Sequence, residues 1–116
     1  MAAHDDCLFC KIIAREVEAE RVHNDGMIIG IKDINPQAPW HVLLMPREHI
    51  VSAGHLNEAH ALMLGRIYAI AADLARRYEI HGGYRLVTNV GEMGGQTVDH
   101  LHIHMLAGRQ MNWPPG

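Results

Sequence analysis

Features that would place a chain in a specialised class are scarce in this sequence of 116 residues. It has two cysteines, too few for the disulfide framework of a small secreted domain. No apolar run approaches the roughly 20 residues that a membrane-spanning helix needs. The first residues, MAAHDDCLFC, lack a basic segment followed by an apolar one, so we expect no signal peptide. We therefore expect a cytoplasmic protein with no membrane partner.

The sequence also has no excess of basic residues. Ten Lys and Arg face thirteen Asp and Glu, for a formal net charge of −3. Domains that bind nucleic acid usually carry a basic patch, so we expect no nucleic-acid partner. The 48% hydrophobic and 20% charged residues are ordinary for a globular chain of one domain. We expect that domain to span 1–116, with flexible residues 1–6 and a C-terminal tail at 108–116.

Hydrophobic periodicity divides the chain into two helices and several strands. A short helix is expected over about 7–15. A long one should start at the N-cap Asn57, run to about Tyr78 and end through Gly82-Gly83. Several connections are too short for parallel crossovers, so we expect an α+β domain with a mainly antiparallel sheet. The expected strands are 27–31, 41–45, 84–90 and 100–106.

Histidine is abundant, with ten copies, and three of them alternate in the stretch DHLHIHML. His100, His102 and His104 share one face if this stretch is a strand. A solvated strand face, a catalytic metal site and phosphate chemistry each account for such a face. A flat strand does not bring alternate side chains to one ion. In the third case one histidine attacks phosphorus while its neighbours hold the anion.

The stretch GEMGGQT, residues 91–97, comes just before the histidines. Gly94 and Gly95 allow backbone N–H groups to approach an anion closely, and Gln96 and Thr97 add donors. Taken alone, the stretch is equally typical of a tight turn. Its position before three alternating histidines favours phosphate chemistry.

The stretch HLHIHML resembles the histidine-triad (HIT) signature, in which three histidines alternate with apolar residues. Further segments are similar to the Hint branch of that family: FCKII at 9–13, DINPQAP at 33–39, GGYR at 82–85, GGQ at 94–96 and GRQMNWPPG at 108–116. The resemblance implies an antiparallel sheet of about five strands with one long and one short helix. It also implies a homodimer in which the sheet continues across the interface.

The resemblance further implies a hydrolase that cleaves the P–N bond of purine nucleoside 5′-phosphoramidates. His102 would be the nucleophile and would form a nucleotidyl-histidine, with its other ring nitrogen held by the carbonyl of His100. His104 and Thr97 would contact the phosphate, and His41 would complete the cluster and relay a proton. No cofactor is needed for this step. Hydrolysis of dinucleoside polyphosphates and a nucleotide- or partner-binding module are the alternatives.

The resemblance also implies a nucleotide site. Asp33 is similar to the ribose-binding acid of the family, because a carboxylate can accept both ribose hydroxyls. The other residues expected to bind the nucleotide are Leu8, Phe9, Ile12, Ile31, Ile34, Asn89, Gly95, Gln96 and Trp113. The apolar members Leu8, Phe9, Ile12 and Ile31 are equally typical of a core. Trp113 would lie near this site or that of the neighbouring subunit, or would simply anchor the tail.

The stretch Cys7-Leu8-Phe9-Cys10 departs from the usual Hint pattern. It resembles another HIT subset, in which C-x-x-C binds a structural zinc together with two histidines. The resemblance implies that His49 and His100 complete the set, giving a closed tetrahedral site. Inert thiols and a redox pair are the alternatives, although the βαβ context of redox motifs is missing. If zinc binds, His100 serves the structure rather than the phosphate.

Overall fold

The computed structural model describes residues 6–116. Their strands form one sheet in the order β1-β2-β3-β5-β4, and every neighbouring pair is antiparallel. The strands are β1 (Arg21–Asn24), β2 (Ile28–Lys32), β3 (Trp40–Pro46), β4 (Tyr84–Thr88) and β5 (Ile103–Ala107). The α+β class and the antiparallel sheet are confirmed. The expected flexibility of residues 1–6 falls, apart from Asp6, outside the described residues.

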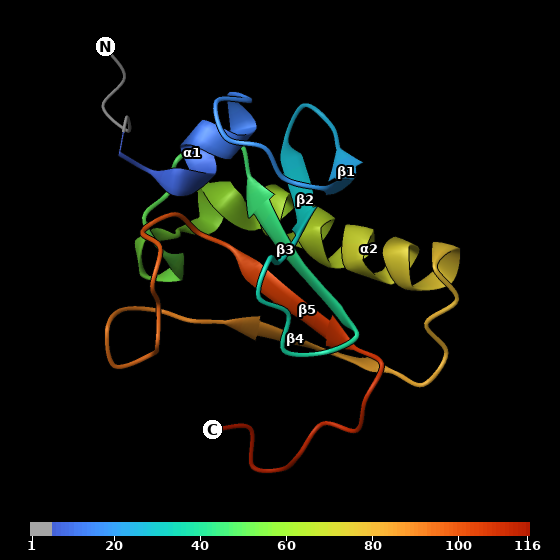
Figure 1. Ribbon diagram of the computed structural model, residues 1–116. Coiled ribbons are helices and arrows are strands. Elements are labelled where there is room, and N and C mark those ends of the chain that lie inside the picture. Colours follow the sequence, from blue (N-terminus) through green and yellow to red (C-terminus); the bar gives the residue numbers. More distant parts are fainter. Residues whose placement is uncertain (1–5) are drawn as a thin grey trace.

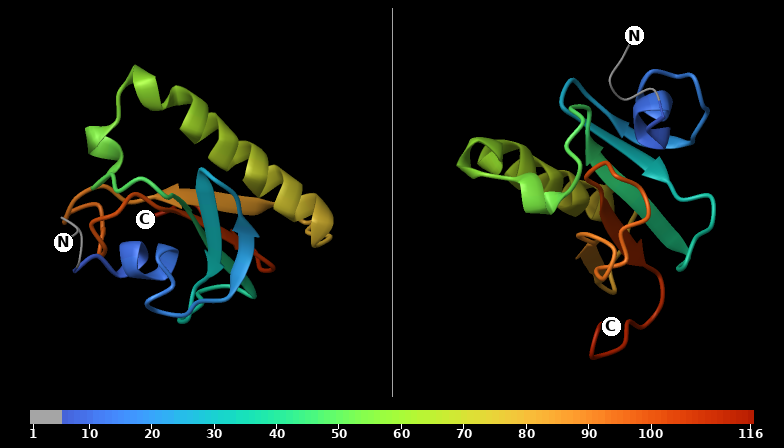
Figure 2. Two further views of the ribbon diagram at one scale, coloured as in Figure 1. Left: turned by 90° about the horizontal axis from the view of Figure 1, so that it is seen from above. Right: turned by 90° about the vertical axis from the view of Figure 1, so that its left-hand side faces the viewer.

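Two helices cover opposite faces of the sheet (Figures 1 and 2). The short α1 (Leu8–Ile13) lies on one face, and the long α2 (Ala61–Arg77) lies on the other. The 3-10 turns η1 (Ala53–His55) and η2 (Glu58–His60) precede α2. Over residues 6–116, neither helix has the length and apolar character needed to cross a bilayer.

Side-chain alternation along the central strands creates two separate cores. Val42, Leu44 and Met105 are fully buried against α2. The intervening positions pack with Phe9 and Ile12 of α1; they are Ile29, Ile31, Leu43 and Met45. Because His104 pairs with Leu43 across β3 and β5, its side chain points to the α1 face. The sheet thus directs this imidazole to the α1 face, where it meets the rings of His41 and His102.

The last strand starts later than expected. It begins at Ile103, and residues 98–100 form a bend. The N–H of Leu101 donates to the carbonyl of Ile50 at 2.6 Å, outside the β-ladder. The expectation of a strand from residue 100 is therefore wrong for His100 and His102, which precede the β5 ladder.

A strand that the periodicity does not predict, β1, forms a hairpin with β2. Asp25 shapes the turn, because its Oδ1 accepts the N–H groups of Met27 at 2.7 Å and Ile28 at 2.8 Å. Its Oδ2 pairs with His23 at 2.6 Å and with Arg66 of α2 at 2.7 Å. One carboxylate therefore holds the hairpin closed and joins it to the long helix.

The ends of the long helix follow local chemistry. Asn57 caps the 3-10 turn that leads into α2, as expected for an N-cap. Glu79, with φ 56°, turns the chain at the other end, and the N–H of Ile80 closes onto the carbonyl of Ala75 at 2.8 Å. The expected stop at Gly82-Gly83 is wrong, because α2 ends at Arg77, five residues before Gly82.

We expect Met105→Ala to lower the free energy of unfolding by about 2–5 kcal/mol, because it opens a cavity in the α2 core. Met105 is 0% exposed, whereas Met93 is 102% exposed in the 91–97 loop. Met93→Ala is the matched control and should change stability by less than about 0.5 kcal/mol. Urea unfolding of both variants measures the difference, and equal costs would contradict the assignment of Met105 to the core.

Candidate functional site

A cavity of about 220 Å³ opens on the α1 face of the sheet. Its walls are mostly apolar, while Asp33, Thr97, His102 and His104 supply polar groups. The apolar lining includes Leu8, Phe9, Ile12, Ile31 and Leu43. Phe9 is only 4% exposed, so it is a core residue and a wall of the cavity at once. The two interpretations of the apolar residues near the N-terminus are therefore compatible.

His102 has a fixed tautomer. Its Nδ1 lies 2.7 Å from the carbonyl oxygen of His100, which can only accept, so Nδ1 carries the proton. Nε2 is then left with a lone pair. The ring is 6% exposed, and burial lowers its pKa below the ordinary value. A neutral imidazole with a free lone pair at the cavity is suited to nucleophilic attack.

His41 and His104 form a hydrogen-bonded chain. The N–H of Gln37 donates to Nδ1 of His41 at 3.0 Å, so the proton of a neutral His41 lies on Nε2. That Nε2 donates to Nδ1 of His104 at 2.9 Å. The proton of His104 is therefore on Nε2. Burial, followed by the neighbouring charges of His102 and His41, lowers the pKa of His104 to about 4, so at pH 7 it is a neutral donor.

Asp33 joins this chain as an acceptor. Its Oδ2 lies 3.5 Å from Nε2 of His41, and its ligand atoms and those of His41 and His104 are mutually within 4.8 Å. A metal ion would need a lone pair on Nε2 of His41. The Gln37 N–H occupies Nδ1 and places the proton on Nε2, so this cluster is a hydrogen-bond relay and not a cation site.

A second cluster has the donor set and spacing of a zinc site. Sγ of Cys7 and of Cys10 lie 3.5 and 3.6 Å from Nδ1 of His100, and Sγ of Cys10 lies 3.2 Å from Nδ1 of His49. Tetrahedral zinc with ordinary bond lengths would separate S and N ligands by about 3.6 Å. Nε2 of His100 donates to the carbonyl of Pro46 at 2.8 Å, which leaves Nδ1 as the ligand atom.

The thiols themselves disfavour the redox alternative. Both Cys7 and Cys10 are free. Burial and the adjacent Cys7 thiol raise the pKa of Cys10 to about 12. Redox-active thiols have lowered pKa values, so the raised pKa of Cys10 does not favour the redox alternative.

Most of the residues expected at the site meet at the cavity. Those that line it are Leu8, Phe9, Ile12, Ile31, Asp33, Ile34, Thr97, His102 and His104. Ile34 lies at the mouth and is 96% exposed. The sequence analysis missed Val17, Glu18, Ala19, Lys32, Leu43 and Val98, which also line the cavity. Leu43 could have been found, because it lies two residues after His41 on the same strand face.

The amides of Asn89 and Gln96 do not line the cavity, because they hold the 91–97 loop. Oε1 of Gln96 accepts the N–H of Gly91 at 3.0 Å, and its Nε2 donates to the carbonyls of Val51 and Val98 at 2.7 and 3.0 Å. Nδ2 of Asn89 donates to a carbonyl of the same loop at 2.7 Å. In this structure both amides serve the loop.

The paired glycines have a steric role in that loop. A Cβ on Gly94 would lie 2.2 Å from the carbonyl oxygen of Val90, and Gly95 has φ +83°. Both positions therefore favour glycine. Gly95 does not line the cavity, but the turn leads the chain to Thr97 and Val98, which do. The N–H groups of Gly95 and Gln96 donate to the carbonyls of Glu92 and Gly91 at 3.0 Å, so they serve the turn. The expected approach of this stretch to an anion stays a prediction.

The tail does not reach the cavity of its own chain. Trp113 is 84% exposed, and the guanidinium of Arg85 donates to the carbonyl of Asn112 at 2.7 Å. This contact anchors the tail on β4, in agreement with the simpler interpretation. Figure 1 shows the tail running below β4, away from α1.

The family profile described as "Scavenger mRNA decapping enzyme C-term binding" matches residues 6–113. A crystal structure described as a HIT family hydrolase from Legionella pneumophila Philadelphia 1 superimposes with a TM-score of 0.92. It is 46% identical and covers 95% of this chain and 99% of that one.

Two curated relatives are similar over nearly the whole chain. The "14 kDa zinc-binding protein" of Zea mays is 40% identical over 94% of this chain and 87% of its own length. An uncharacterised HIT-like protein of Synechococcus elongatus is 41% identical over 97% of this chain and 98% of its own. With His102 and His104 at one cavity, these matches show that the chain belongs to the histidine-triad family.

Proposed function

We propose that this protein hydrolyses purine nucleoside 5′-phosphoramidates through a nucleotidyl-histidine formed on His102. The observation that carries the proposal is the contact between Nδ1 of His102 and the carbonyl of His100, at 2.7 Å. It fixes the proton on one nitrogen and frees the other for attack. The name of the Legionella relative, a HIT family hydrolase, supports the reaction class.

The nucleoside binds in the cavity on the α1 face. The base lies against Phe9, Ile12 and Ile31, whose apolar surfaces suit a flat ring of either purine. Asp33 accepts the ribose hydroxyls, and the N–H of Asn35 holds its Oδ1 at 2.8 Å. The α-phosphate then lies next to His102 and His104 at the polar end of the same cavity.

The reaction has two balanced steps. Nε2 of His102 attacks phosphorus as the P–N bond of the substrate breaks, and the leaving amine takes a proton from solvent. Water then attacks the phosphorus of the nucleotidyl-imidazolium, releases the nucleoside monophosphate and returns a proton to solvent. Nε2–H of His104 and the hydroxyl of Thr97 donate to the phosphoryl oxygens, where negative charge develops.

We assign His41 the positioning of His104. The N–H of Gln37 donates to the neutral ring of His41, and that ring donates to Nδ1 of His104. The proton of His104 is therefore on Nε2 and points away from His41. Proton transfer from His104 would leave an anionic imidazole in a buried site, which is costly. The sequence-based expectation of a proton relay through His41 stays a prediction.

A structural zinc is the second part of the proposal. Cys7, Cys10, His49 and His100 would hold the ion, and the Zea mays relative is named as a zinc-binding protein. The bound ion would stabilise the thiolates and join the start of α1 to the segment before β5. The proposed cleavage of the P–N bond takes no step on this ion.

A homodimer is the third part. Strand β4 forms one edge of the sheet, so its outer backbone groups have no strand partner among residues 6–116. Tyr84 on this strand, Val90 just after it and Tyr68 of α2 are exposed apolar residues. We propose that two sheets join along β4, so that the tail of one chain approaches the site of the other.

We expect His102→Ala to lower the turnover of adenosine 5′-phosphoramidate by about 10³-fold or more, because the nucleophile is removed. Binding of AMP, measured by calorimetry, and the melting temperature should change little. His81→Ala, at an exposed histidine outside the cavity, is the matched control.

Three results would contradict this assignment. The first is unchanged turnover in His102→Ala. The second is that the wild type hydrolyses a diadenosine polyphosphate faster than adenosine 5′-phosphoramidate. The third is that the wild type binds nucleotide but turns over neither substrate. The second would favour the polyphosphate alternative, and the third would favour a binding module.

We expect metal analysis to give one zinc ion per chain, and His49→Ala to lose it because a ligand is removed. The free energy of unfolding should fall by about 2 kcal/mol or more. His81→Ala should keep the metal. A chelator should inactivate the wild type only as fast as it unfolds. Rapid inactivation of folded protein, reversed at once by zinc, would instead indicate a metal-dependent reaction.

We expect sedimentation of the wild type to give about twice the 13.0 kDa of one chain. Tyr84→Glu should shift the protein towards monomers, because a carboxylate would be buried in each half of the proposed apolar interface. Tyr84→Phe, which keeps the apolar ring, should remain dimeric. A wild type that is monomeric throughout the micromolar range would refute dimerisation along β4.

A further inference from the structure

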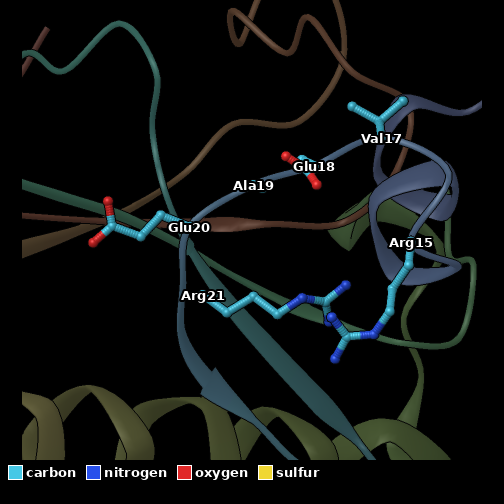
Figure 3. Close-up of a pocket in the computed structure, with 6 residues that line it drawn as sticks. All are labelled: Arg15, Val17, Glu18, Ala19, Glu20 and Arg21. Carbon is cyan, nitrogen blue, oxygen red and sulfur yellow. The ribbon is translucent and has the colours of Figure 1, made fainter.

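A second cavity, of about 500 Å³, lies beside the nucleotide cavity. It is lined by Arg15, Val17, Glu18, Ala19, Glu20 and Arg21 (Figure 3). The segment from Val17 to Ala19 lines both cavities and therefore forms a wall between them. The proposed hydrolysis uses none of the charged groups of this second cavity.

Of the two terminal nitrogens of the Arg21 guanidinium, only one has a hydrogen-bond partner among residues 6–116. Its Nη2 donates to the carbonyl of Ile12 at the end of α1, at 2.6 Å. Its Nη1 is buried and has no hydrogen-bond partner among residues 6–116. Buried donors are nearly always paired, so this nitrogen lacks the acceptor that a buried charged donor normally has.

Arg15 places a second positive charge next to the first. Figure 3 shows the two guanidinium groups together, and burial and the charges of Arg15 and Arg47 lower the pKa of Arg21. Like charges at this range repel each other. Among the described residues, neither Arg15 nor Arg21 forms an ion pair with a carboxylate.

The acidic residues of the cavity do not neutralise this pair. Glu20, just before β1, pairs with Lys32 of β2 at 3.0 Å. In Figure 3 the carboxylates of Glu18 and Glu20 are turned away from the two guanidinium groups. The positive charge of the arginines is therefore open to a ligand.

We propose that Arg15 and Arg21 form a binding site for a phosphate-type oxyanion, separate from the histidine site. Guanidinium groups present forked N–H donors that match the oxygens of such an anion. The anion accepts from the guanidinium groups of Arg15 and Arg21 and offsets the repulsion between the two cations. Its site lies across the Val17–Ala19 wall from the base.

The backbone at Arg15 allows a sharp test. Arg15 has φ 64° and follows the C-cap Ala14, and the N–H of Glu16 closes onto the carbonyl of Lys11 at 2.8 Å. Glycine is the preferred residue at this position of a helix end. Arg15→Gly therefore removes the guanidinium and also removes the steric cost of a positive φ in a residue with a Cβ. Glu79 occupies the same position after α2 with φ 56°, so Glu79→Gly is the matched control.

The experiment is a titration of the full chain with inorganic phosphate at constant ionic strength, followed by NMR of the arginine Nε–H groups and of the amides of 15–21. Saturating AMP is present, so that the histidine site is filled. We expect saturable shifts of Arg15 and Arg21. Arg15→Gly should weaken phosphate binding about tenfold or more at an equal or higher melting temperature. Glu79→Gly should leave the affinity unchanged.

Pyrophosphate and acetate form the other arms of the titration. Pyrophosphate should bind at least as tightly as phosphate, and acetate should bind more weakly. The proposal is overturned if no saturable shift occurs at Arg15 and Arg21, if Arg15→Gly binds phosphate as the wild type does, or if acetate matches phosphate. Because the readout is binding at 15–21, failure of this site and failure of the proposed hydrolysis are distinguishable.

Discussion

Three backbone groups determine what the buried histidines can do. The carbonyl of His100 holds the proton of His102 on Nδ1, the carbonyl of Pro46 holds that of His100 on Nε2, and the N–H of Gln37 forces that of His41 onto Nε2. A neutral imidazole has one donor and one acceptor, so each contact assigns both ring nitrogens. In the proposed function, one ring is the nucleophile, one a metal ligand and one a support, although the side chains are chemically identical.

These backbone groups are available because the strands are irregular at the right places. The bend at 98–100 takes the carbonyl of His100 out of the sheet, and the proline-containing segment before β3 presents the N–H of Gln37. Regular strands would use the same groups in their ladders. The regular part of β5, by contrast, sets the direction of His104. The site thus uses two histidines within the sheet, His41 and His104, and two just before β5, His100 and His102.

Local chemistry could be predicted from the sequence wherever a short motif carries it. The alternating histidines pointed to His102, and the pair Cys7 and Cys10 pointed to the cluster that the fold brings together. Tertiary contacts could not be predicted in the same way. The Gln96 amide looked like an anion donor, but the fold uses it to bridge three backbone groups. The β1 strand was missed although Asp-Gly, at 25–26, is a strong hairpin signal.

Phe9 explains why the two clusters should act together. Its ring meets those of His100 and His102 edge-on, with centroids 5.9 and 5.0 Å away, and it lies in the segment that separates the two cysteines. An ion that holds Cys7 and Cys10 therefore also fixes a wall of the nucleotide cavity. Since the carbonyl that sets the tautomer of His102 belongs to the proposed ligand His100, movement of that ligand would move the acceptor as well. Zinc would then act on the reaction indirectly, through the position of one carbonyl and one aromatic ring.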